Sequence, residues 1–170
     1  MITTLSKEFI DQSVFRIDEN TKRIKKCFDE IEEADIWKFA NENSNSIGNL
    51  VLHLCGNIRQ YIISALGKTE DTRERDKEFS AKTGFEKAEL MQKLIDTINK
   101  ATEVIKKCNE KDLIQIYAVQ GFDLSGIAII IHVTEHYSYH TGQIAFWTKQ
   151  LKNKDLGFYR NINLNVKNKN

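Results

Sequence analysis

Three of the four histidines in the chain follow one another at intervals of four residues, at His132, His136 and His140. In a helix, residues four apart are displaced by about 40° around the axis, so the three imidazoles share one face. Neighbouring members lie about 6 Å apart along the axis, close enough for two imidazoles to chelate one ion, whereas the two ends lie about 12 Å apart. The segment therefore offers one chelating pair, and the third histidine has another role.

The fourth histidine, His53, lies in a second helical segment, beside its apolar stripe and in line with Asn49, Asn57 and Gln60. Polar groups in such a line are costly to bury unless they find partners. If the two helices face each other, His53 completes a site of three imidazole nitrogens. Three protein ligands leave coordination positions open for water or substrate, which is typical of catalytic rather than structural metal sites.

A second interpretation of the spacing is structural, because His-x-x-x-His also occurs by chance among surface and core residues. The histidines would then pack as ordinary helix side chains. Glu135 and Tyr139 flank the pair, and residues in such positions are more often exposed than catalytic.

Four segments have the apolar periodicity of amphipathic helices. They cover about residues 10–31, 47–65, 85–108 and a stretch that restarts at 121–125 and runs to about Leu151. Ser46 is a good N-cap for the second helix and Gly67 is its expected end. Residues 113–120 alternate and are rich in β-branched side chains, which favours a short extended or hairpin stretch before the last helix.

The connection at residues 67–84 is polar, charged and bounded by glycines, and its length implies a topological or functional job. In a four-helix bundle it can serve as a crossover that lets the third helix run parallel to the second. The absence of proline is compatible with long helices. We therefore predict an all-α four-helix bundle, with one domain over residues 1–160 and a loosely held tail at 161–170.

Composition narrows the function classes. Lys and Arg number 25 and Asp and Glu 24, a net charge of +1, so no global field recruits nucleic acid or an anionic membrane. The first residues lack the apolar core of a signal peptide, and no apolar run is long enough to span a bilayer. The three cysteines form no CxxC pair. We expect a cytoplasmic protein with free thiols, none of them a reactive nucleophile.

Two segments carry a family resemblance. EHYSYHTGQIAFWTKQL (135–151) resembles the C-terminal signature of the DinB/YfiT-like superfamily, in which His-x-x-x-His-x-Gly-Gln-Ile lies on the last bundle helix. SIGNLVLHLCGNIRQYI (46–62) looks like the matching second helix, which holds the first metal ligand in that superfamily. RERDKEF, at residues 73–79, resembles an uncharacterised bacterial branch of it.

The resemblance implies that His53, His136 and His140 are the metal ligands and that His132 is the spare histidine. It also implies an up-down-down-up bundle, homodimers, and zinc or nickel as the metal. Gly142 is expected to permit a close helix contact, and Gln143 to hydrogen-bond near the site or make a polar contact inside the bundle. His132, Gln143, Asn57 and Glu135 are further candidates for supporting the ligands or lining a pocket.

Three functions follow from an open site of this kind. The resemblance favours a metal-dependent transferase that uses a low-molecular-weight thiol and a small-molecule substrate. A metal-dependent hydrolase is the first alternative, although Glu135, its candidate general base, points about 100° away from His136. A non-catalytic, dimeric metal-binding stress protein is the second, since one fold carries many functions.

Overall fold

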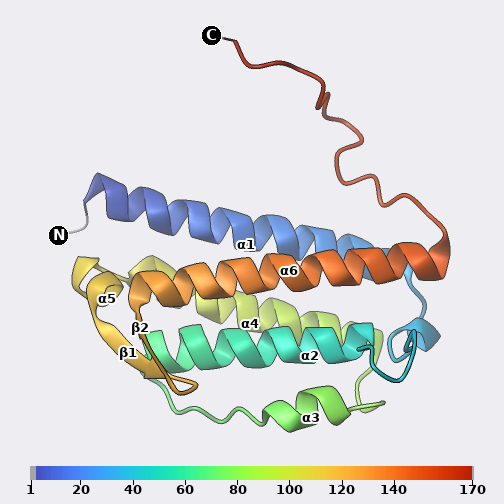
Figure 1. Cartoon of the computed structure of the whole chain (residues 1–170), viewed down its shortest axis with the longest axis horizontal. Coiled ribbons are helices and arrows are strands. Elements are labelled where there is room, and N and C mark those ends of the chain that lie inside the picture. Colours follow the sequence, from blue (N-terminus) through green and yellow to red (C-terminus); the bar gives the residue numbers. More distant parts are fainter. Residues whose placement is uncertain (1–2, 170) are drawn as a thin grey trace.

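The computed structural model describes residues 3–169 and is built around four long helices (Figure 1). These are α1 (Thr4–Glu30), α2 (Ile47–Ile58), α4 (Lys87–Lys107) and α6 (Gly126–Lys152). Between them lie the short helices η1 (Glu33–Asp35), α3 (Arg75–Ser80) and α5 (Glu110–Ile114), and the strands β1 (Ile116–Val119) and β2 (Phe122–Ser125).

The bundle has the expected up-down-down-up topology. In Figure 1, α1 and α6 run in one direction, while α2 and α4 run in the other. α1 packs against α6 and α4, and α2 packs against the same two helices from the opposite side. The core between them consists mainly of isoleucine and leucine side chains, among them Ile17, Leu54, Leu94 and Ile144. The crossover (residues 67–84) makes the parallel pair possible by returning the chain along the bundle to the start of α4.

Helix α2 begins as its sequence predicts. The Ser46 side chain accepts a hydrogen bond from the Asn49 backbone, and the Asn49 side chain accepts one from the Ser46 backbone. This reciprocal capping fixes the start of the helix. Its end widens into the π-helical segment η2 (Arg59–Leu66), which stops at Gly67 as expected. π-Helical turns occur frequently at functional sites.

The burial of α2 differs from the single apolar stripe that the sequence predicts. Every residue of α2 except Gly56 is buried. The reason is the crossover, whose helix α3 packs across the side of α2 that a plain four-helix bundle would leave in water. The polar line of α2 therefore faces protein, so each of its groups needs a partner there.

The extended stretch predicted at 113–120 is confirmed only as strand β1, because residues 113 and 114 end helix α5. The restart of the last helix is corrected. β1 pairs antiparallel with β2, and Phe122 to Ser125 form the second strand rather than a lead-in to the helix. Ser125 is the N-cap of α6. Gln120 and Gly121 make the tight turn with positive φ angles of 51° and 81°, a conformation that favours glycine.

The remaining chain after α6 forms no helix or strand in the described residues, and residues 161–169 are exposed. Met1, Ile2 and Asn170, which belong to the predicted domain and tail, lie outside the described residues. Among residues 3–169, no helix combines the length and apolar character that a membrane crossing needs.

Candidate metal centre

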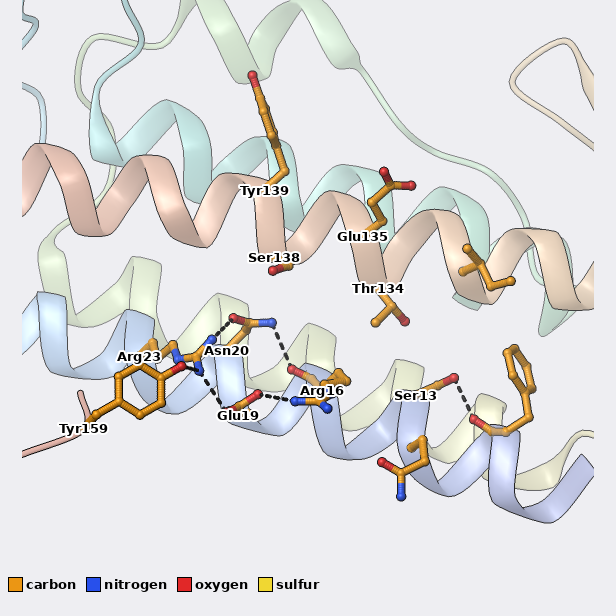
Figure 2. Close-up of a pocket in the computed structure, with 13 residues that line it drawn as sticks. Ser13, Arg16, Glu19, Asn20, Arg23, Thr134, Glu135, Ser138, Tyr139 and Tyr159 are labelled. Atoms are coloured by element: carbon orange, nitrogen blue, oxygen red, sulfur yellow. Dashed lines mark hydrogen bonds and ion pairs between the residues drawn. The ribbon is translucent and has the colours of Figure 1, made fainter. Parts of the chain in front are cut away.

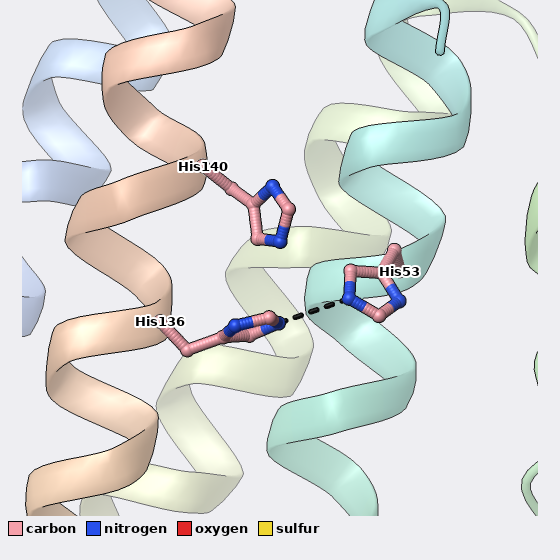
Figure 3. A group of neighbouring side chains, drawn as sticks. All are labelled: His53, His136 and His140. Atoms are coloured by element: carbon pink, nitrogen blue, oxygen red, sulfur yellow. Dashed lines mark hydrogen bonds between the residues drawn. The ribbon is translucent and has the colours of Figure 1, made fainter. Parts of the chain in front are cut away.

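Helices α2 and α6 bring three imidazoles to one point (Figure 3). One ring nitrogen each of His53, His136 and His140 lies within 4.8 Å of the other two. The shortest approach joins His53 Nε2 to His136 Nε2 at 2.9 Å. His53 and His140 are 6 % and 8 % exposed, whereas His136 is partly exposed, so water reaches the cluster on the His136 side. The structure thus joins the three residues that the sequence resemblance names as ligands.

A carboxylate behind His53 fixes the orientation of its ring. His53 Nδ1 donates to Glu78 Oε2 at 3.0 Å, and both side chains are about nine-tenths buried. A proton held on Nδ1 leaves the lone pair of Nε2 directed at the other two histidines. Metal-binding histidines commonly have such a carboxylate partner, which raises the basicity of the ligating nitrogen.

Glu78 is in turn held by Arg73 from the same crossover. The guanidinium donates from Nε to Oε1 at 2.8 Å and from Nη2 to Oε2 at 2.9 Å. Its Nη2 also lies 3.2 Å from His53 Nδ1, and because both nitrogens carry hydrogens, they converge on Oε2 rather than bond to each other. Burial alone would raise the pKa of Glu78, but the hydrogen bonds from Arg73 and His53 lower it below its usual value. Glu78 is therefore a carboxylate at neutral pH.

Two residues of α2 make room for this carboxylate and hold its backbone. A side chain at Gly56 would place its Cβ 1.8 Å from Glu78 Oε1, so only glycine admits the carboxylate at this position. About two turns earlier, the Asn49 amide donates to the carbonyl oxygens of Glu78 at 2.9 Å and Ala81 at 2.7 Å. The Gln60 side chain accepts from Arg73 Nη1 at 2.9 Å. The polar line of α2 thus holds the crossover in place.

Sequence reasoning missed Arg73, Glu78 and Gly56. The available signal was the polar line itself, since Asn49, His53 and Gln60 require partners that the bundle helices do not supply. A charged connection of eighteen residues, 67–84, was the remaining source of such partners.

His140 has a neutral partner instead of a carboxylate. Its Nδ1 donates to Gln143 Oε1 at 2.7 Å. Of the two contacts predicted for Gln143, the hydrogen bond near the site is therefore the one present. The predicted role of Gly142 is wrong, because this residue is exposed and a Cβ there would meet nothing within 4 Å.

Burial, with the neighbouring imidazoles, lowers the pKa of His136 to about 3, and burial lowers the pKa of His140. Both rings are neutral at pH 7, the form that binds a metal.

His132 lies outside the group of three. Its ring stacks on Tyr61 at 4.3 Å and on His136 at 5.5 Å between centroids. Its Nε2 lies 3.3 Å from Asn57 Nδ2. Asn57 Oδ1 is the one buried side-chain oxygen or nitrogen without a partner among residues 3–169. His132 and Asn57 therefore form a layer that packs against the side of His136.

Glu135 lies outside the group of three histidines. It is exposed and lines a groove of about 770 Å³ between α1 and α6, together with Thr134, Ser138 and Tyr139 (Figure 2). On the α1 side, Glu19 pairs with Arg16 and Arg23. None of the three clustered histidines lines this groove.

The cysteines play no part in the cluster. Cys27, Cys55 and Cys108 are buried and unpaired, as predicted. Burial raises the pKa of each thiol to about 11, so none is a thiolate at neutral pH.

The donor set fits a divalent transition metal. Imidazole ligands suit zinc, nickel, copper and iron. With metal–nitrogen bonds of about 2.0–2.1 Å, ligand nitrogens around one ion lie roughly 3–3.5 Å apart. The observed separations, from 2.9 Å up to 4.8 Å, bracket that value. Small rotations of the His136 and His140 side chains bring the three nitrogens to it.

Known structures share this fold. A DinB-like protein from Bacillus subtilis matches with a TM-score of 0.65 at 14% identity, over 85% of this chain and 94% of the other. A DinB-like protein from Bacillus cereus matches with 0.67 at 15% identity, over 85% and 91%. A conserved protein from Enterococcus faecalis matches with 0.73 at 14% identity, over 91% and 99%. No functionally curated protein matches the chain.

The fold and the cluster define the class: this is a DinB-like helical bundle with three histidines that could hold a metal ion. Within that class the chain belongs to the family described as "Protein of unknown function (DUF1572)", whose profile matches residues 4–163.

The carboxylate behind His53 generates a first prediction. Glu78→Gln removes the charge that polarises the ring and leaves the buried Arg73 unpaired, so the affinity of the apo protein for added Zn²⁺ should fall about 10–100-fold. Competition with a chromogenic chelator measures this affinity. The matched control is Glu74→Gln, which lies four residues earlier and pairs with Lys77 at the surface. Equal Zn²⁺ affinities in the two variants would show that Glu78 does not support the cluster.

The lowered pKa of His136 generates a second prediction. Between about pH 6.5 and 3 the unfolded chain binds a proton at His136 that the folded chain excludes, so the free energy of unfolding should decrease as the pH falls through this window. Urea unfolding of chelator-treated protein at pH 7 and pH 5 measures it. His136→Gln should show a smaller decrease than wild type. The same decrease in both proteins would mean that His136 is protonated in the folded state.

Proposed function

We propose that this protein is a divalent-metal-dependent enzyme in which His53, His136 and His140 hold the ion. The observation that carries the proposal is the convergence of three imidazole nitrogens, one of them on a ring backed by the buried Glu78 carboxylate. Three protein ligands leave positions for a substrate, which is the arrangement of catalytic sites. Zinc and nickel are the first candidates for the ion.

Among metal-dependent reactions, transfer to or from a small thiol is favoured over hydrolysis. An ion held by three imidazoles supplies Lewis acidity, which lowers the pKa of a thiol or water that reaches it. Hydrolysis also needs a general base beside the water. Glu135 lines the groove between α1 and α6, which none of the three clustered histidines lines, and Glu78 is occupied by Arg73 and His53. A thiol-dependent transferase has less need of that base, because a thiol ionises far more readily than water even before it reaches an ion.

The chain's own residues would then position the reactants. Phe79 packs against His53 at 4.7 Å and Tyr139 against His140 at 5.0 Å, between ring centroids. The two aromatic rings come from α3 and α6, on either side of the cluster. They offer apolar walls for a small electrophile and reduce the access of water to the reacting atoms.

The test is thiol conjugation by the zinc- or nickel-loaded protein. Glutathione, cysteine and N-acetylcysteine are each incubated with aryl halides, epoxides and α,β-unsaturated carbonyl compounds, and thiol loss is followed. Metal-loaded wild type should conjugate at least one pair faster than chelator-treated protein, and His140→Ala should abolish the difference.

His132→Ala is the control, because this histidine lies on the same helix outside the ligand group. It should keep most of the metal-dependent rate. A metal-loaded protein that conjugates no pair in the panel, but hydrolyses ester or amide substrates, would replace the transferase by the hydrolase. A loaded protein with neither activity would favour the non-catalytic metal-binding role.

A further inference from the structure

A second cavity lies on the other side of Glu78 from the histidines. It has a volume of about 460 Å³ and lies between α2, α4 and the crossover. That volume falls within the range of small-molecule sites, about 300–1,000 Å³. Gly56 and Glu78 line it, so the carboxylate that orients His53 separates this cavity from the candidate metal centre.

The lining combines an apolar surface with cationic groups. Leu52 and Cys55 from α2 meet Ala81 and Phe85 from the crossover side. Around them stand four cations, Arg59, Arg73, Lys77 and Lys93, and two carboxylates, Glu74 and Glu78. A ligand in this cavity therefore contacts both apolar surface and charge.

Two of the four cations are not neutralised. Arg73 pairs with Glu78, and Lys77 pairs with Glu74 at 2.8 Å. Within residues 3–169, neither Arg59 nor Lys93 has a carboxylate within ion-pair distance. They come from different segments, Arg59 from the start of η2 and Lys93 from α4, so two unpaired positive charges border one apolar cavity.

Arg59 contacts the crossover and Lys93 contacts Phe85, the residue that follows it. Arg59 Nε donates to Thr72 Oγ1 at 3.4 Å. Lys93 Nζ lies over the Phe85 ring, 5.4 Å from its centroid. The hydroxyl group of Thr72, which also lines the cavity, can donate to a bound oxygen atom, whereas the Thr97 hydroxyl donates to the Lys93 carbonyl oxygen at 2.7 Å.

We propose that this cavity binds a small amphipathic carboxylate, with its anionic group between Arg59 and Lys93 and its apolar part against Leu52, Cys55 and Phe85. The charge balance supports a single carboxylate. Glu74 and Glu78 also line the cavity and would repel a more highly charged anion. A purely apolar ligand would leave the two cations without a partner.

Occupancy of this cavity strengthens metal binding. This second part of the inference rests on the proposed metal centre. A ligand that bridges α2, α4 and the crossover favours the docked crossover, which is the state that places Glu78 on His53. Two ligands that favour the same state raise each other's affinity by the same factor.

Octanoate is the probe, and 1-octanol is its neutral counterpart of the same chain length. Calorimetric titration of the full-length chain, in chelator-treated and zinc-loaded forms, measures both ligands. Octanoate should bind at least tenfold more tightly than 1-octanol. The double variant Arg59→Ala/Lys93→Ala should weaken octanoate at least tenfold. The control Lys100→Ala/Arg160→Ala removes two exposed cations outside the cavity and should change the octanoate affinity less than twofold.

The two forms separate this inference from the proposed function. Octanoate binding to the chelator-treated protein tests the cavity without any metal, whereas zinc titration with and without octanoate tests the coupling. Equal affinities for octanoate and octanol, equal affinities in the two double variants, or no binding up to about 10 mM would overturn the carboxylate site. Octanoate that binds but leaves the Zn²⁺ affinity unchanged would overturn the coupling alone.

Discussion

A buried ion pair in the connection between two helices organises this protein. Glu78 lies in the crossover with its side chain 10 % exposed, and Arg73, five residues earlier, is only 3 % exposed. Removing two such charges from water is costly, and the geometry compensates by two parallel hydrogen bonds between them. Neither charge is tolerable without the other, so the segment that carries both must dock as one unit. Docking delivers the carboxylate to His53.

That constraint explains the composition of α2. A bundle helix normally turns polar residues to water, but this one buries a line of them under the crossover. Asn49 donates hydrogen bonds to the crossover backbone, and Gly56 leaves space for the carboxylate. Gln60 accepts a hydrogen bond from Nη1 of the guanidinium. The residues that orient the candidate ligand and the residues that fasten the crossover are therefore the same set. Topology and site are coupled, because the long connection needed to make α2 and α4 parallel also supplies the group behind His53.

Much of the fold was predictable from local patterns. Apolar periodicity located all four helices, Ser46 and Gly67 marked the ends of the second, and alternation located the first strand of the hairpin. The second strand at Phe122–Ser125 was missed, because its pairing with β1 depends on a turn at Gln120 and Gly121 that the sequence shows only weakly. The three clustered histidines followed from spacing plus resemblance. Spacing alone left the choice between His132 and His140 open.

Arg73 and Glu78 could not be assigned in the same way. They lie in a charged connection where most side chains are exposed, and nothing local separates Glu78 from Glu74, which pairs at the surface. Only the tertiary path of the crossover over α2 distinguishes them. The expectation for Gly142 failed for a related reason, because the direction a helix position faces depends on packing and not on residue type.

The central claim is that three particular histidines bind one metal ion, and elemental mass spectrometry of untagged protein tests it most directly. Wild type reconstituted with zinc or nickel should carry about one ion per chain, which His53→Ala, His136→Ala and His140→Ala each lose. His132→Ala, four residues from a ligand on the same face of α6, should retain it. Absence of metal from wild type, or loss of metal in His132→Ala with retention in His140→Ala, would contradict the account.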